Sequence, residues 1–244
     1  MRRLLLTIRF DGTYFSGWQV QPNGITVQQR LQDALEAFLG TRPDVTGCSR
    51  TDAGVHANQF CLHFDTDSNM SPLAIINAVN AHLPESIAAY DCKEVPLDFH
   101  ARYSCKAKNY IYKIYNSKFR NPFYKNYALL YRRPLDVELL NCCCKKFLGT
   151  HDFAGFCSSN SSVIDTVRTI NNFGVFKKDD LIIVSITADG FLYNMVRILV
   201  GTLLYINEGK IDHDSIPELI NSKDRKKAGP TVPPCGLYLN RVYY

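Results

Sequence analysis

The stretch LLLTIRFDG, residues 4–12, sets the start of the fold. Leucine, isoleucine and phenylalanine occupy its even-numbered positions, and the polar Thr7 and Arg9 lie between them. This period of two predicts a half-buried β-strand, and the Asp11-Gly12 pair is a turn signal that ends it. The chain therefore begins with one element of a sheet.

The residues that follow add a helix and two more strands. Thr26 begins a capping-box pattern, and Gly40 is placed to end the helix. A short strand near Val45 and a longer one through residues 60–64 come next, so the segment around Asp52 connects two strands. The apolar residues of the helix recur at helical spacing: Val27, Leu31, Ala34, Leu35 and Phe38.

The rest of the chain repeats this alternation. Ser71-Pro72 predicts the start of a helix, and Asp136 is a further N-cap. We predict helices over 72–83, 137–147, 191–207 and 212–221, and strands over 87–95, 110–114, 163–170, 181–187 and 237–242.

Strands and helices alternate without the glycine fingerprint of a dinucleotide-binding fold. This favours a mixed α/β (α+β) fold of two sheet-and-helix halves that face a shared groove. We place the halves at residues 1–104 and 105–244, with the linker around 96–106. No internal repeat is detectable in the sequence.

The composition is that of an ordinary globular protein, with 46% apolar and 21% charged residues. No apolar run approaches the length of a membrane helix, and the N-terminus turns polar too early for a signal peptide, so we expect a cytoplasmic protein. The nine cysteines are odd in number and three are consecutive, which favours reduced thiols. Their spacing offers no paired zinc ligands, and we expect no structural metal.

The net charge of +5 is unevenly distributed. Between Phe99 and Arg133 the chain has nine Lys or Arg, ten Phe or Tyr and no Asp or Glu, so the remainder is net negative. Such a segment could bind nucleic acid, because basic side chains contact phosphates and aromatic rings stack on bases. A strand with a solvated basic edge explains the same pattern equally well.

The densest polar cluster is GCSRTDAGVHA, residues 47–57, between two predicted strands. It places the carboxylate of Asp52 beside a cation, a hydroxyl and two glycines, which suits an active-site loop. A tight turn, in which Asp52 accepts backbone N–H bonds and Arg50 neutralises it, fits the residues equally well. A nucleophilic set of Cys48, Asp52 and His56 is the third interpretation.

The string RTDAGVHA, residues 50–57, resembles the signature of the TruA family of pseudouridine synthases. The resemblance extends over nearly the whole chain. Cys48-Ser49 departs from the small residues and glycine that bacterial members more often have there, whereas Ala53 fits the bacterial branch. Further blocks similar to family motifs follow in order: DGTYFSGWQ from Asp11, TVQ from Thr26, FHAR from Phe99, YIY from Tyr110, GTHDF from Gly149, FLYNMVR from Phe191 and GLYL from Gly236.

The resemblance implies a pseudouridine synthase fold, in which a mixed and largely antiparallel sheet is built from two RRM-like or ferredoxin-like halves around a central groove. It implies isomerisation of uridine to pseudouridine in the anticodon stem-loop of tRNA, at tRNA positions 38–40, by a homodimer without a cofactor. Asp52 would be the catalytic nucleophile, and Arg50 would brace the gap left by the everted base. The C-terminal half would complete the active-site cleft and supply the dimer interface.

The reaction breaks the N1–C1′ bond and joins C5 to the same sugar carbon without oxidation, so it needs no redox cofactor. It does need a carboxylate. The carboxylate either adds covalently to the sugar or base, or removes the C2′ proton to give a glycal, and the sequence does not choose between these routes. Arg197, on an apolar predicted helix, is expected to keep Asp52 ionised, or else to form a structural salt bridge. Tyr110 is expected to stack on the uracil and help proton transfer at C5, or else to fill the core.

Two other motif residues receive no catalytic role. We expect His56 to bind backbone, and Trp18 either to stack on RNA or to fill the core. Two further classes of function stay open. One is a non-catalytic module that binds structured RNA through the basic and aromatic segment, and the other is a cysteine hydrolase built on Cys48 and His56.

Overall fold

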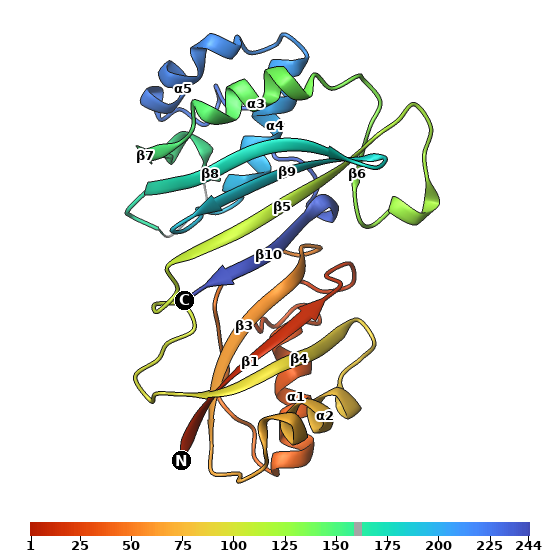
Figure 1. Cartoon of the computed structure of the whole chain (residues 1–244), viewed down its shortest axis with the longest axis vertical. Coiled ribbons are helices and arrows are strands. Elements are labelled where there is room, and N and C mark those ends of the chain that lie inside the picture. The colour runs from red at the N-terminus through yellow and green to blue at the C-terminus, as the bar shows by residue number, and fades with distance from the viewer. Residues whose placement is uncertain (159–162) are drawn as a thin grey trace. The chain divides into compact units, whose positions relative to one another are not determined.

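The computed structural model describes residues 1–158 and 163–244, which form two compact units. The first unit contains residues 1–106 and 238–244, and the second contains residues 107–237. Both units combine a sheet with helices (Figure 1). The predicted mixed α/β class with largely antiparallel strands is confirmed.

The first unit consists of β1 (Arg2–Phe10), α1 (Val27–Leu39), β2 (Thr46–Gly47), β3 (His56–Thr66), α2 (Pro72–His82), β4 (Ile87–Val95) and the last strand of the chain, β10 (Leu237–Tyr243). Its strand order is β4-β1-β3-β10, and β2 also pairs with β3. β1 is antiparallel to β3 and β4, whereas β10 is parallel to β3. The helices α1 and α2 contact each other, and α2 packs on β4 (Figure 1).

Local sequence signals explain where these helices begin and end. Thr26 Oγ1 accepts a hydrogen bond from the N–H of Gln29 at 3.3 Å, and Ser71 Oγ accepts one from the N–H of Ala74 at 3.2 Å. Both predicted N-caps are therefore confirmed. Gly40 ends α1 in the left-handed conformation, with φ 75°, which glycine adopts without strain.

The second unit consists of β5 (Ala107–Asn116), β6 (Leu129–Tyr131), α3 (Val137–Lys145), β7 (Gly149–Asp152), β8 (Val167–Lys178), β9 (Leu181–Ala188), α4 (Met195–Asn207) and α5 (Ile216–Ser222). Its strand order is β5-β9-β8-β7, all antiparallel, with β6 parallel to β5. α3 packs on β8, and α4 contacts both α3 and β5. The predicted cap of α3 is confirmed, since Asp136 Oδ1 accepts from the N–H of Leu139 at 2.9 Å.

The two units share a topology, as the resemblance implied, although no internal repeat is detectable in the sequence. The order β1-α1-β2-β3-α2 gives the neighbouring strands β1-β3-β2 in the first unit. In the second unit the elements follow along the chain as β5-α3-β8-β9-α4, with β6 and β7 as additional strands. In the sheet, β9 lies between β5 and β8. Both are the split β-α-β arrangement of ferredoxin-like folds.

One predicted strand has different bounds. The strand predicted over 163–170 begins at Val167 and continues to Lys178, where Asp179 turns the chain at φ 53° into β9. The prediction ended too early because residues 171–174, NNFG, are typical of turns. In the structure the side chain of Asn141 on α3 accepts from the N–H of Val175 at 2.7 Å, which secures this part of the strand.

Two predicted helices also have different bounds. The helix predicted over 191–207 begins at Met195, because Asn194 before it lies in the left-handed region at φ 62°. The helix predicted over 212–221 is divided into the 3₁₀ turn His213–Ser215 and α5. Pro217 lies in the first turn of α5, where its missing N–H has no helical partner to lose.

Aromatic side chains fill the cores of both units. Trp18 stacks on Phe60 with ring centroids 4.2 Å apart in the first unit. In the second, Phe147 packs edge-on against Phe156 at 5.5 Å. Within the described residues, no helix combines the length and the hydropathy that crossing a membrane requires.

Candidate active site

The segment that contains Asp52 is a loop, as predicted. Residues 48–55 leave β2 and return into β3, and these two strands pair antiparallel through Thr46 with His63 and Gly47 with Leu62. Within the loop the carbonyl of Asp52 accepts from the N–H of Val55 at 3.2 Å. The chain reverses at this point, so the Asp52 side chain stands at a turn between two strands.

A second segment, residues 11–18, holds this loop in place. The N–H of Trp18 donates to the carbonyl of Thr51 at 3.1 Å, and the N–H of Gly54 donates to the carbonyl of Phe15 at 3.2 Å. These bonds lie on either side of Asp52 in the sequence. The conformation of the loop around Asp52 therefore depends on the N-terminal motif.

Two glycines let the segments approach closely. A Cβ on Gly12 would overlap the carbonyl oxygen of Val55. A Cβ on Gly17 would lie 2.5 Å from the carbonyl oxygen of Thr51 and 3.2 Å from the carbonyl carbon of Asp52. Gly17 also has φ +94°, a conformation that side chains disfavour. A larger residue at position 17 must displace the Asp52 loop.

We therefore expect Gly17→Ala to lower kcat by at least about tenfold, since displacements of this size misalign reacting groups. Gly40→Ala is the matched control, because Gly40 also has positive φ, at +75°, but a Cβ there would meet nothing within 4 Å. Both variants should lose about 1 kcal/mol of stability from backbone strain. Steady-state kinetics with thermal unfolding separates the two effects, and equal kcat values for both variants would refute the positioning role of Gly17.

His56 has a structural partner, as expected. Its Nδ1 accepts a hydrogen bond from the N–H of Gly12 at 3.0 Å and also lies 3.1 Å from Asp11 Oδ1. The buried ring stacks on Tyr238 with centroids 4.6 Å apart. Trp18 is 3% exposed and fills the core, which excludes the stacking on RNA that the sequence left open.

The structure does not favour a cysteine nucleophile at Cys48. Its side chain is 0% exposed, and its N–H donates to the carbonyl of Cys61 at 2.8 Å. A substrate cannot reach such a thiol without opening the sheet edge. Of the three consecutive cysteines, Cys143 and Cys144 are buried core residues, whereas Cys142 is exposed.

Arg50 and Asp52 differ in exposure. The Arg50 side chain is exposed, whereas Asp52 is half-buried. Between them Thr51 is buried, and its hydroxyl has no hydrogen-bond partner among the residues that the structure describes. An unsatisfied buried hydroxyl is unfavourable for folding.

Tyr110 and Arg197 belong to the second unit. Tyr110 lies on β5, is 6% exposed and packs edge-on against Phe191 with centroids 5.0 Å apart. Arg197 lies on α4, where its Nε donates to the carbonyl of Val232 at 2.7 Å and its Nη1 donates to Asn194 Oδ1 at 2.6 Å. Both acceptors are neutral groups, and their hydrogen bonds fix the orientation of the guanidinium.

Asn194 and Val232 are site residues that were not predicted from the sequence. The left-handed conformation of Asn194, which ends the preceding loop, also brings its side chain onto the guanidinium of Arg197. Asparagine tolerates this conformation better than most residues, so an Asn directly before an apolar helix was the available signal. Val232 contributes a main-chain carbonyl, and no sequence signal identifies such a contact.

One motif block has a structural role. Asp152 in the block GTHDF accepts from the hydroxyl of Thr166 at 2.6 Å and pairs with Lys223 at 2.7 Å. The bond from Lys223 is the main reason why the pKa of Asp152 is lowered. The ion pair with Lys223 joins β7 to the residues after α5. The carboxylate of Asp152 therefore stabilises the second unit.

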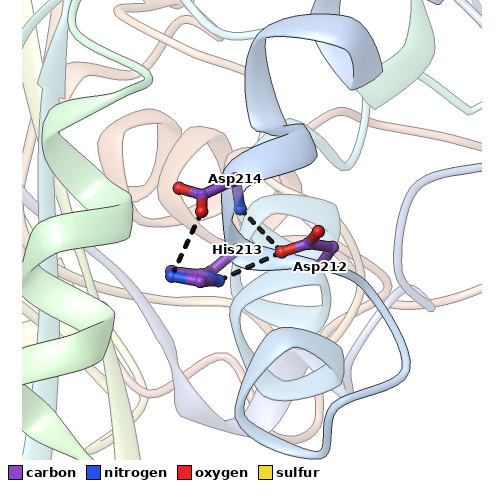
Figure 2. Close-up of side chains that lie close together, drawn as sticks. All are labelled: Asp212, His213 and Asp214. Atoms are coloured by element: carbon purple, nitrogen blue, oxygen red, sulfur yellow. Dashed lines mark hydrogen bonds and ion pairs between the residues drawn. The ribbon is translucent and has the colours of Figure 1, made fainter.

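Figure 2 shows a cluster of Asp212, His213 and Asp214, whose ligand atoms could hold a metal ion. The three side chains are exposed, and Asp214 already pairs with Lys146 at 2.6 Å. Asp212 Oδ1 accepts from the N–H of Asp214 at 3.0 Å, so it serves as the cap of the 3₁₀ turn. Capping and ion pairing account for this cluster.

The chain is similar in sequence to known proteins over most of its length. A family model described as tRNA pseudouridine synthase matches residues 6–104 and 143–244. Relatives named tRNA pseudouridine synthase A from Ruminiclostridium cellulolyticum, Acetivibrio thermocellus and Clostridium kluyveri are 45%, 44% and 43% identical, and each alignment covers 100% of both chains. Among solved structures, a chain titled Crystal Structure of a Cbf5-Nop10-Gar1 Complex is similar with TM-score 0.33 and 8% identity, over 85% of this chain and 54% of that chain.

The matched segments include some of the candidate site residues. Arg50, Asp52 and Arg197 lie within them. Tyr110 lies in the unmatched residues 105–142, which the full-length alignments to the relatives nevertheless cover.

Proposed function

Because the chain belongs to the tRNA pseudouridine synthase family, we propose that it isomerises uridine in the anticodon stem-loop of tRNA, with Asp52 as the catalytic nucleophile. One observation carries this role: hydrogen bonds from the N-terminal motif hold the loop on both sides of Asp52. Main-chain bonds to Thr51 and Gly54 fix the backbone around Asp52 while the carboxylate stays half-buried. A fixed and partly desolvated carboxylate is what nucleophilic or general-base chemistry requires.

The reaction conserves all atoms of the nucleotide. The N1–C1′ bond breaks, the base turns, a C5–C1′ bond forms, the C5 proton leaves and N1 takes up a proton. Nothing is oxidised or reduced, so the chemistry requires no redox cofactor. Asp52 serves either as the nucleophile toward the sugar or base, or as the base that removes the C2′ proton.

Arg197 is the proposed partner of Asp52. Its guanidinium is held in a fixed direction by two acceptors, the carbonyl of Val232 and the side chain of Asn194. An opposite charge at close range favours the ionised carboxylate, which is the reactive form. Arg50, exposed and two residues before Asp52, is proposed to brace the RNA where the target base is everted.

We propose further that the protein acts in the cytoplasm as a homodimer. Residues 1–104 would provide the Asp52 loop, and residues 105–244 would complete the cleft and form the dimer interface. These assignments rest on the family resemblance, and sedimentation of the purified protein tests the dimer.

Incubation with unmodified tRNA and no added metal, followed by carbodiimide labelling, tests the proposed function. Pseudouridine in the anticodon arm is the expected product. Binding of tRNA without conversion would instead favour the non-catalytic RNA-binding module. Hydrolysis that needs no RNA and is lost on thiol alkylation would favour a cysteine hydrolase.

The hydroxyl of Tyr110 is proposed to assist proton transfer at C5 while the ring stacks on the uracil. We expect Tyr110→Phe to lower kcat by about 10²-fold, the lower end of general acid–base effects. Tyr112→Phe is the matched control, because Tyr112 lies on the same strand and its hydroxyl donates to the carbonyl of Pro233 at 2.7 Å. It should lower stability by about 1 kcal/mol and leave kcat unchanged. Near-full activity of Tyr110→Phe would exclude a required hydroxyl.

A further inference from the structure

A loop of the second unit presents large aromatic side chains to solvent. Residues 117–128, named here the β5–β6 loop, connect β5 to β6 and contain the 3₁₀ turn Pro122–Tyr124 (Figure 1). Phe119 is 80% exposed and Phe123 is 85% exposed. Exposed apolar side chains that gather in one place mark an interaction surface rather than ordinary surface variation.

The loop is held in a defined shape. At its base Asn116 donates from Nδ2 to two main-chain carbonyls across the loop, at 2.9 and 2.7 Å. Asn121 Oδ1 caps the 3₁₀ turn by accepting from the N–H of Phe123 at 3.0 Å. The ring of Tyr124 packs on Tyr115 with centroids 4.9 Å apart. The two phenylalanines are therefore exposed by a conformation that other residues of the loop maintain.

The charge around these rings is positive. Lys118, Arg120 and Lys125 are exposed, and within residues 1–158 and 163–244 no carboxylate forms an ion pair with any of them. By contrast, Arg133 beyond the loop pairs with Glu208 at 3.0 Å. Uncompensated cations beside exposed rings are complementary to a polyanion that offers flat apolar faces. A second copy of this chain, with net charge +5, is less complementary.

We propose that the β5–β6 loop is an RNA-binding site, additional to the site of the target uridine. Phe119 and Phe123 stack on unpaired bases of tRNA, and Lys118, Arg120 and Lys125 contact its phosphates. The proposal rests on the proposed function for the identity of the RNA. The loop lies in residues 105–142, outside the segments that the family model matches, so its own residues are what support the site.

Kinetics with unmodified full-length tRNA gives the first test. We expect the double variant Phe119→Ala, Phe123→Ala to raise KM by about tenfold or more, the effect of losing one or two stacked bases, with kcat changed less than about twofold. Removal of the three basic side chains should reduce the slope of log KM against log salt by about 0.7 to 0.9 for each phosphate that they neutralise. Unchanged KM and salt slope in these variants would overturn the site.

Phe176→Ala is the matched control. Phe176 is a 48% exposed phenylalanine on β8 in the same unit, and the adjacent Lys177, Lys178, Asp179 and Asp180 offset one another in charge. The KM of the Phe176→Ala variant for tRNA should equal that of the enzyme without substitutions. An equal rise for Phe176→Ala and the loop variant would show that the effect is not specific to the loop.

Photocrosslinking identifies the occupant directly. A benzoylphenylalanine at position 123 should crosslink to tRNA, and the same probe at position 176 should not. Crosslinking to a second copy of the chain, or no tRNA adduct at position 123, would overturn the proposal. If the unmodified enzyme forms no pseudouridine but position 123 still crosslinks to tRNA, the proposed function fails and the loop site stands.

Discussion

Asp52→Asn should abolish pseudouridine formation, with a fall in kcat of at least about 10⁴-fold, as expected when a group that reacts directly is removed. The amide is nearly the same size as the carboxylate, so the loop should keep its main-chain bonds to the N-terminal motif. Carbodiimide labelling of pseudouridine in full-length tRNA measures the loss, and tRNA binding should change little.

Asp65→Asn is the control for this variant. Asp65 is a carboxylate of the same unit, and Arg3 lowers its pKa through hydrogen bonds, the shorter of which is 2.7 Å. Removing it should lower stability but leave kcat unchanged, because the residue lies on β3 outside the loop. Comparable loss of kcat in both variants would indicate damage to the fold instead of the chemistry.

Arg197→Ala should lower kcat by about 10² to 10³-fold and leave measurable turnover, in contrast to Asp52→Asn. The arginine does not react, and its removal takes away electrostatic stabilisation of the ionised carboxylate. Arg197→Lys should recover part of this loss, because it keeps the charge but not the planar fork that binds Asn194 and Val232.

Arg225 provides a matched control for Arg197. It lies in the same unit and also donates to neutral acceptors, the carbonyl of Gly229 at 2.9 Å and the hydroxyl of Thr231 at 3.2 Å. Arg225→Ala should reduce stability and keep kcat. If Arg197→Ala likewise reduced only stability, the role of Arg197 would be structural. That was the alternative interpretation of the sequence, in which Arg197 forms a structural salt bridge.

The sequence predicted most of the fold because its signals are local. Thr26, Ser71 and Asp136 cap their helices with the bonds that their residue types favour, and Gly40 ends α1 in the left-handed conformation. The place of Asp52 between two strands followed from periodicity on either side. These features depend on residues within a few positions of one another, so one sequence is enough to find them.

Other features depend on contacts between distant segments. The strand β8 passes through Asn172 and Gly174, and the packing of α3 overrides their preference for turns. The bonds from residues 15–18 to the Asp52 loop join main-chain groups, so side-chain patterns could not predict them. The shared topology of the two units is a property of strand pairing, which can repeat without any repetition of sequence, so it was expected from the family resemblance and not from residue patterns.

The composition of the segment from Phe99 to Arg133 allowed either RNA contact or a solvated strand edge. The structure shows that its aromatic residues have different environments. Tyr110 and Tyr112 are buried on β5, whereas Phe119 and Phe123 are exposed on the β5–β6 loop. Only the distribution of burial distinguishes the rings that pack in the core from those available to a partner.

The most direct test of the central claim is tritium release from tRNA labelled at C5 of uridine, measured in a single turnover with excess enzyme. Release requires that C5 has joined the sugar, so it reports the isomerisation itself. The enzyme should release tritium rapidly, and Asp52→Asn should release none above background while still binding the tRNA. Tritium release by Asp52→Asn at a rate near that of the unmodified enzyme would contradict the assignment of Asp52 as the reacting carboxylate.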